Sequence, residues 1–176
     1  MNDHLRFVPQ ATSILKDEKG VVLIAAMMIL VLLTIIGIAS TTVSNTETKI
    51  ATNEAVYQRN FYRAEGATME AVEVMEGLAN PKTAAPGWLW ASLNTFTEDN
   101  LNETTFWEGT MTGADAVPEP SITLADTTYV VVSGGIVEGE SLDMGSTKIH
   151  RYAVYGHCAP PNRGATTVEI GYLKAF

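Results

Sequence analysis

The feature of this 176-residue chain that most limits its fold is a long segment without charge. From Val21 to Thr46 there are 26 residues without Asp, Glu, Lys or Arg, and residues 21–39 are apolar except for Thr34 and Gly37. An α-helix rises about 1.5 Å per residue, so about 20 residues span a hydrocarbon core of about 30 Å. A helix also satisfies its own backbone groups, as lipid requires. A buried helix of a soluble protein seldom exceeds about 14 unbroken apolar residues. The segment therefore predicts a membrane-spanning helix or a signal sequence.

The charges on either side of this segment indicate its orientation. Arg6, Lys16 and Lys19 precede it, whereas the first base that follows it is Lys49. Lys and Arg are enriched on the cytoplasmic side of membrane helices. We therefore expect residues 1–20 to lie in the cytoplasm and the rest of the chain to lie outside it.

The remaining charge is strongly acidic and unevenly placed. The formal net charge is −9, and from Thr83 to Thr147 there are ten acidic residues and no base. Phosphate binding requires clustered Lys and Arg, so this balance argues against a nucleic-acid partner. Because Cys158 is the single cysteine, the chain is not a disulfide scaffold.

Three processing outcomes fit the apolar segment, and the composition does not choose among them. The segment can remain as a plain membrane anchor for an interaction domain outside the cytoplasm. An ordinary signal peptidase can cleave after Ala39, where small residues precede Ser40, and release a secreted acidic binding protein. Cleavage before the segment, at Gly20, instead leaves the hydrophobic helix on the mature protein.

A helical pattern continues beyond the apolar segment. No proline occurs between residues 10 and 80, and Pro81 then supplies a stop. We predict one long helix over residues 21–80, with a membrane-spanning or filament-core part over 21–42; a membrane helix followed by a coiled-coil linker is the alternative. Apolar residues at seven-residue intervals, with two more at four-residue offsets, form the predicted packing face of this helix: Val43, Ile50, Tyr57, Phe61, Ala64, Ala71, Met75 and Leu78.

After Pro81 the sequence changes to loops and strands. We predict strands at Tyr129–Ser133, Ile149–Gly156 and Thr166–Leu173, and a shorter one at Phe106–Met111. The last two long strands flank a loop with two prolines and are expected to pair as a hairpin. The predicted fold class is α+β, with one long N-terminal helix, apolar in its first third and amphipathic thereafter, packed on a small antiparallel sheet.

Motifs within residues 16–76 resemble the N-terminal region of the PilX-type minor pilins of type IV pili. The residues that carry this resemblance are Lys19-Gly20, Leu32 to Ala39, Thr41-Thr42, the Glu47-x-x-Ile50-Ala51-x-Asn53 element, Phe61 to Ala67, and Glu73. The closing segments, from Arg151 to Val154 and from Val168 to Tyr172, are also similar to the C-terminal hairpin of that family.

The resemblance implies a division of the chain into three parts. Residues 1–20 form a cytoplasmic prepilin leader, which a prepilin peptidase removes after Gly20 to leave an N-methylated Val21. Residues 21–80 form the long helix, which first spans the inner membrane and later packs among other minor and major pilins. Residues 81–176 form a periplasmic α+β head domain. The implied function is that of a minor pilin in the initiation or tip complex of pilus assembly, with the pilus or its tip as final location and a tip adhesin among the partners.

Two positions depart from the pattern of most pilins. The mature chain would begin with Val21 rather than Phe or Met, and Ala25 stands where most pilins carry a glutamate. The resemblance implies that this missing carboxylate pairs with a neighbouring subunit's terminal amine in a filament, so its absence favours a unique position over the repeating shaft. A tip pseudopilin of type II secretion is the alternative within this class. The 96 residues after the helix leave little room for the larger inserted domain of that group.

Other candidate chemistry is sparse. The acid-rich stretch is compatible with a calcium site, but it contains no D-x-D-x-D-G loop, which favours a solvated acidic surface: Glu98, Asp99, Glu103, Glu108, Asp115, Glu119 and Asp126. Neighbours on a strand point to opposite faces, so His157 and Cys158 are a poor chelating pair. Trp88 and Trp90 are expected in the core rather than at a subunit interface. No phosphate loop, nucleophile elbow or His-Asp-Ser set occurs, so we expect no catalytic activity, no cofactor and no metal.

Overall fold

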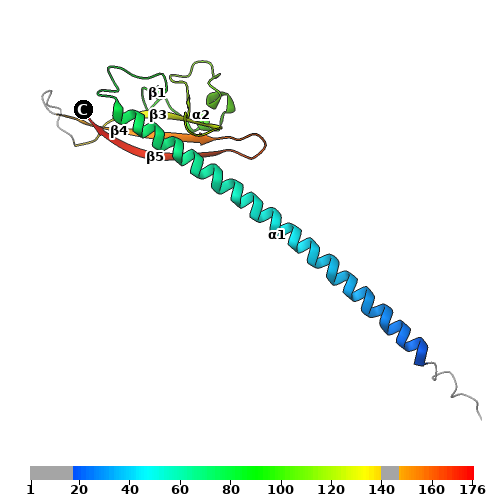
Figure 1. The fold of residues 1–176 in the computed structure, drawn as a ribbon. Coiled ribbons are helices and arrows are strands. Elements are labelled where there is room, and N and C mark those ends of the chain that lie inside the picture. The colour runs from blue at the N-terminus through cyan, green and yellow to red at the C-terminus, as the bar shows by residue number, and fades with distance from the viewer. Residues whose placement is uncertain (1–17, 140–146) are drawn as a thin grey trace, which may run out of the picture. The chain divides into compact units, whose positions relative to one another are not determined.

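The computed structural model describes residues 18–139 and 147–176 and confirms the α+β class. The chain divides into two compact units, one up to Ala51 and one from Thr52 to Phe176, which we call the N-terminal and C-terminal units. The elements in chain order (Figure 1) are α1 (Glu18–Gly77), β1 (Leu89–Trp90), α2 (Glu98–Asn102), α3 (Thr104–Trp107), β2 (Glu119–Pro120), β3 (Thr127–Ile136), β4 (Ile149–Cys158) and β5 (Thr166–Ala175).

Helix α1 is a single element of 60 residues. It begins at Glu18, slightly before the predicted start, and ends at Gly77, where the Leu78 amide donates to the Met75 carbonyl (3.2 Å). Pro81 lacks a backbone N–H and follows this end, which explains why the helix does not continue. Because α1 crosses the boundary between the two units, residues 18–51 and 52–77 are described separately.

The sheet has the strand order β1-β3-β4-β5, and β2 also pairs with β3. β3, β4 and β5 are ten-residue antiparallel strands, with Val131 opposite Val154 and Val154 opposite Ile170. β1 pairs with β3 in parallel, so the sheet is mixed rather than wholly antiparallel as predicted. Two parallel strands need a long connection that returns the chain to the starting end of the first strand. The segment with α2, α3 and β2 is this connection between β1 and β3.

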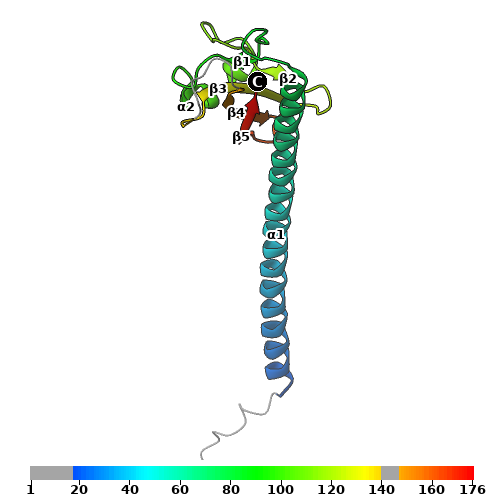
Figure 2. The same cartoon turned by 90° about the vertical axis from the view of Figure 1, so that its left-hand side faces the viewer.

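The strands divide their side chains between two apolar clusters, one on each face of the sheet. The C-terminal part of α1 covers the first face (Figures 1 and 2), where the buried residues are Ala67, Ala71, Met75, Trp88, Leu89, Tyr129, Val131, Tyr152 and Val154. The opposite face is covered by α3 and its flanking loops, and its buried residues are Trp90, Phe106, Trp107, Ala116, Val130, Val132 and Tyr155. The predicted strand at Phe106–Met111 is therefore wrong, because Phe106 and Trp107 are buried from the short helix α3.

A glycine allows α1 to approach the sheet closely. A Cβ atom at Gly156 on β4 would lie 2.2 Å from the Ala64 carbonyl oxygen and 2.7 Å from Thr68 Cγ2. Contacts this short do not occur between real atoms, so only glycine fits under the helix at this point. Ala64, Ala67, Thr68 and Ala71 supply the small, buried helix side of the same contact.

Candidate functional site

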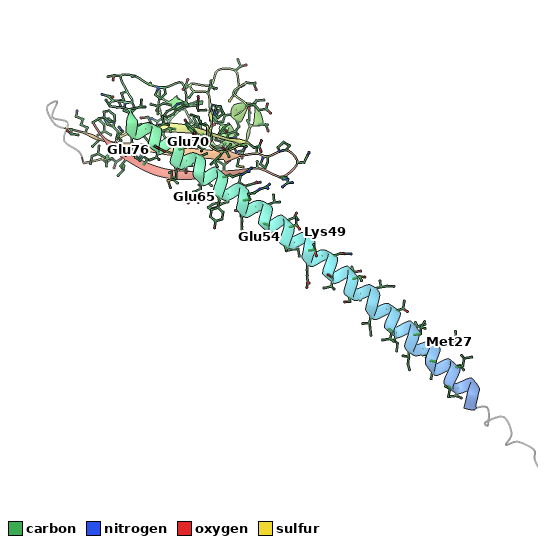
Figure 3. The ribbon with its side chains drawn as sticks, in the orientation of Figure 1. Met27, Lys49, Glu54, Glu65, Glu70 and Glu76 are labelled. Carbon is green, nitrogen blue, oxygen red and sulfur yellow. The ribbon has the colours of Figure 1, made fainter. Side chains whose placement is uncertain are left out.

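The N-terminal unit is an apolar helix without an internal core. Its large apolar side chains between Val21 and Ile38 are each 53–69% exposed. Figure 3 shows the side chains around Met27 projecting from the helix with no other element of this unit beside them. Among the described residues, α1 is the one helix that is long and apolar enough to cross a membrane. Exposed apolar surface of this extent indicates a lipid or protein environment that covers it.

Three threonine side chains of this unit are hydrogen-bonded within the helix. The hydroxyls of Thr34, Thr42 and Thr46 each donate to the carbonyl four residues earlier, at 2.7–3.0 Å. Such back-bonding removes the need for water at these side chains. The threonines are therefore compatible with an environment that contains no water.

The residues predicted for processing and filament contact lie in the first turns of α1. Gly20 is half-buried and Val21 is exposed, and both belong to the helix. Ala25 is exposed one turn further on, and its methyl group offers neither charge nor hydrogen bond. The preceding leader residues 1–17 lie outside the described residues. Cleavage after Gly20 and the role of Ala25 remain predictions.

The predicted packing face of α1 runs through both units, and its residues have different surroundings. Val43, Ile50 and Tyr57 are exposed, Phe61 is just over a third exposed, and Leu78 is half-buried. The three remaining residues, Ala64, Ala71 and Met75, are fully buried against the sheet. An α-helix drifts about 20° per seven residues relative to a heptad repeat, so a strict seven-residue stripe turns by about 100° between positions 43 and 78.

Sequence reasoning missed Asn60, Ala67 and Thr68, which are also buried on α1. These residues follow the buried positions at spacings of three and four, and a helical wheel of period 3.6 over residues 60–75 could have found them. The seven-residue pattern omitted them because it does not follow the drift of the helix.

Glu70 joins α1 to the loop before β3. Its carboxylate accepts hydrogen bonds from the Ser121 hydroxyl (2.6 Å), the Ile122 amide (2.7 Å) and the Thr123 hydroxyl (2.7 Å). Desolvation raises the pKa of Glu70, but these hydrogen bonds to the charged form outweigh it, and the net pKa is lowered. Glu70 is therefore a charged anchor for the loop (Figure 3).

The last strand fixes the C-terminal end of α1. Lys174 on β5 is buried, and its ammonium donates to the carbonyls of Met75 (2.8 Å) and Glu76 (3.2 Å). The Tyr172 hydroxyl donates to the Glu76 carboxylate at 2.5 Å. A cation at the end of a helix satisfies free carbonyls and interacts favourably with the helix dipole. Desolvation and the neighbouring Glu76 both raise the pKa of Tyr172, which keeps its hydroxyl a donor.

The candidate chemistry of the C-terminal unit does not converge on one place. Within 18–139 and 147–176, no three His, Cys, Asp or Glu residues are grouped so that they could hold a metal ion. His157 stacks on Trp107 (4.4 Å between ring centroids), and burial lowers its pKa to about 4. Cys158 is buried, and desolvation raises the pKa of its thiol. Asp126 lies 3.9 Å from Arg63. Ring stacking accounts for His157, burial accounts for Cys158, and a contact with Arg63 accounts for Asp126. These groups therefore do not define a shared chemical site.

Helix α1 is apolar and exposed in the N-terminal unit, and within the C-terminal unit it packs on a mixed sheet. Residues 19–68 match the family model described as PilX N-terminal, and this supports a PilX-type type IV pilin. The resemblance found in the sequence is thereby confirmed for the N-terminal region. No curated protein and no solved structure matches the chain. The PilX family is one of structural pilins rather than enzymes.

Proposed function

We propose that this chain is a minor pilin that takes part in type IV pilus assembly, as a subunit of the initiation or tip complex. The observation that carries the proposal is the exposed apolar start of α1, which coincides with the PilX N-terminal match over residues 19–68. In this function the helix is held first in the inner membrane, with the C-terminal unit in the periplasm. It later packs among the helices of other minor and major pilins.

Helix packing explains how one surface serves both locations. Lipid tails and neighbouring apolar helices are similar solvents for apolar side chains, so transfer from the membrane to the filament exposes little apolar surface to water. The threonine hydroxyls need no new partner during this transfer, because they are bonded to the carbonyls of their own helix. The mature surface begins at Val21 once a prepilin peptidase has cleaved after Gly20.

Ala25 supports a unique position for this subunit. A carboxylate within a membrane helix costs about 2.5–3.5 kcal/mol on insertion scales, so a chain that contains one needs a partner for it. This chain has alanine there and cannot form the corresponding ion pair with a neighbour. It is therefore suited to start or cap a stack, where it contacts a tip adhesin, rather than to extend the shaft.

Substitution at the processing site tests the proposal. Gly20→Ala should abolish leader removal and reduce piliation when it replaces the natural chain in its host. Gly37→Ala is the matched control, because Gly37 lies within the same helix and a Cβ atom there would meet nothing within 4 Å. It should leave processing intact. Normal processing and piliation of the Gly20→Ala variant would show that the chain does not act as a processed pilin.

A further inference from the structure

The outer edge of β5 is an open edge of the sheet. β5 is the last strand in the order β1-β3-β4-β5, and β4 is the one described strand that pairs with it (Figure 1). The Lys148 and Phe176 backbones exchange two hydrogen bonds of 3.2 Å at one end of this pairing. Bonded pairs alternate with non-bonded pairs in an antiparallel ladder, so every second residue of β5 directs its N–H and C=O away from β4: Thr167, Glu169, Gly171, Leu173 and Ala175.

This edge lacks the features that usually prevent strand addition. Exposed edges are commonly protected by short strands, proline, bulges or charged side chains. β5 has ten residues and no proline, and it pairs with β4 at ten consecutive positions without a register shift. Its one basic residue, Lys174, is buried and bonded to the end of α1, which leaves Glu169 as the one charge on the exposed face of the strand. The edge of β5 is therefore long, regular and suited to pair with a further strand.

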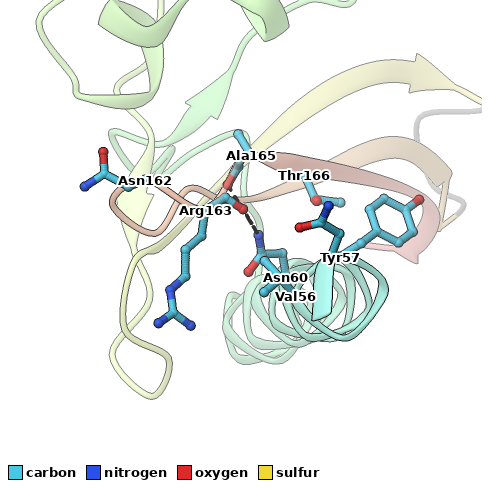
Figure 4. Close-up of a pocket in the computed structure, with 9 residues that line it drawn as sticks. Val56, Tyr57, Asn60, Asn162, Arg163, Ala165 and Thr166 are labelled. Carbon is cyan, nitrogen blue, oxygen red and sulfur yellow. Dashed lines mark hydrogen bonds between the residues drawn. The ribbon is translucent and has the colours of Figure 1, made fainter. Parts of the chain in front are cut away.

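β5 is held in place at both of its ends. Before the strand, the buried Asn60 of α1 donates from Nδ2 to the carbonyls of Arg163 (3.0 Å) and Gly164 (3.3 Å), as Figure 4 shows. At the other end, the Lys174 ammonium donates to the Met75 carbonyl (2.8 Å). A binding surface that is already ordered loses less conformational entropy on association. The edge of β5 is therefore pre-formed for a partner.

The exposed face of β5 indicates which side chains an added strand should carry. Leu173 is 59% exposed, Glu169 is exposed, and a Cβ atom at Gly171 would meet nothing within 4 Å. Side chains that lie directly opposite each other on neighbouring strands interact, so an apolar side chain matches Leu173, and Lys or Arg matches Glu169. An aromatic ring opposite Gly171 fills the open space beside the glycine.

A second copy of this chain fits this edge poorly. Antiparallel pairing of two β5 strands about Gly171 would place Leu173 opposite Glu169, which matches neither side chain. The C-terminal unit contains 16 acidic and seven basic residues, so two such units also repel each other. A strand from another protein that contains a basic residue avoids both problems.

We propose that the edge of β5 binds an extended strand of a different protein, with the sequence apolar-x-aromatic-x-basic. The strand pairs antiparallel to β5, as β4 does, because antiparallel pairs are slightly more stable per residue. Its apolar, aromatic and basic residues then lie opposite Leu173, Gly171 and Glu169. Main-chain hydrogen bonds give the affinity, and these three side chains give the specificity.

Fluorescence anisotropy of a labelled peptide tests this proposal on the detergent-solubilised full chain. The peptide has blocked ends and the sequence Thr-Thr-Val-Thr-Tyr-Thr-Lys-Thr-Thr, in which Val, Tyr and Lys are set to face Leu173, Gly171 and Glu169. We expect saturable binding with a dissociation constant below about 1 mM. Exchange of Val and Lys keeps the composition but reverses the pattern, and it should weaken binding at least about three-fold. This test does not depend on the proposed role in pilus assembly.

Changes at single positions test the hydrogen-bond phase and the charge pair. The N–H of the peptide Tyr faces β5, so its N-methylation should weaken binding at least about ten-fold, whereas N-methylation of the next Thr, whose N–H faces away, should not. Glu169→Lys should weaken binding, and a peptide with Glu in place of Lys should bind this variant better than it binds the natural chain. Glu119→Lys is the matched control, because Glu119 is exposed on β2, which pairs with β3 rather than β5, and it should leave binding unchanged.

The methylated peptides decide the outcome if Glu169→Lys fails to fold, because they are tested on the natural chain. Absence of saturable binding, equal effects of the two methylations, or equal effects of Glu169→Lys and Glu119→Lys would overturn the proposal. Dimers of the natural chain in which the amides of Glu169 and Leu173 are protected from hydrogen exchange would show that a second copy occupies the edge, and would also overturn it.

Discussion

The close contact between Gly156 and α1 makes a prediction about the stability of the C-terminal unit. In Gly156→Ala, the new methyl group would lie 2.2 Å from the Ala64 carbonyl oxygen, 2.7 Å from Thr68 Cγ2 and 3.1 Å from the Thr68 amide nitrogen. Two of these three atoms belong to the helix backbone, so no side-chain rotation can relieve the clash. The helix must move away from β4, which loosens the packing of the apolar cluster on that face.

The expected cost lies at the upper end of the range for overpacked cores. Overpacking costs about 1–3 kcal/mol, and we expect about 3 kcal/mol here because the obstacle is backbone. For a unit of this size, that loss lowers the melting temperature by roughly 10 °C. Gly171→Ala on β5 is the matched control, because a Cβ atom there meets nothing within 4 Å, and it should change stability by less than about 0.5 kcal/mol.

Urea unfolding of the full chain in detergent, followed by tryptophan fluorescence, measures this effect. All three tryptophans lie in the C-terminal unit, so the signal reports on the unit that contains the contact. A loss of less than about 1 kcal/mol for Gly156→Ala, or an equal loss for Gly171→Ala, would refute the proposed close packing of α1 on β4.

Three further substitutions test the anchors of α1 and its membrane segment. Glu70→Gln should lower the free energy of unfolding by about 1 kcal/mol at neutral pH, whereas the exposed Glu73→Gln should not. The folded pKa of Glu70 lies below its ordinary value of 4.5, so its stabilisation is present above about pH 4.5 and is lost as the pH falls through the folded pKa. Urea titrations at successively lower pH below 4.5 should therefore find that the stability difference between the variant and the natural chain shrinks. Lys174→Met should cost about 1–2 kcal/mol and speed amide exchange in the last turn of α1, with exposed Lys82→Met as the control that leaves exchange unchanged. Ala25→Glu should move the subunit from the pilus tip into the shaft, as immunogold labelling would show, and an unchanged distribution would contradict the proposed placement.

The long elements of this fold could be predicted from the sequence. An uncharged apolar run and the absence of proline between residues 10 and 80 predict α1, and the predicted positions of β3, β4 and β5 agree with the structure within a few residues. These elements have strong, long hydrophobic patterns, so local sequence dominates their structure. The short elements could not be predicted in this way. Phe106 and Trp107 suit a strand equally well, and only packing against the sheet favours helix α3.

The candidate site was predictable only in part. The apolar start of α1 follows directly from the sequence, because no other part of the chain is needed to define it. The contact between Asn60 and the loop that joins β4 to β5 was not predictable, because the carbonyls that accept hydrogen bonds from Asn60 lie about 100 positions away in the sequence. Such a contact has no local sequence signal. The same holds for Glu70 and Lys174, whose partners are also distant in the sequence.

Mass spectrometry of the mature N-terminus tests the proposed pilin function most directly. The chain is purified from its natural host, and its N-terminal peptide is sequenced. We predict a mature chain that begins at N-methylated Val21, after removal of residues 1–20. A chain that begins at Ser40 would instead show a secreted protein, and an intact leader would show a plain membrane anchor; either result would contradict a processed type IV pilin.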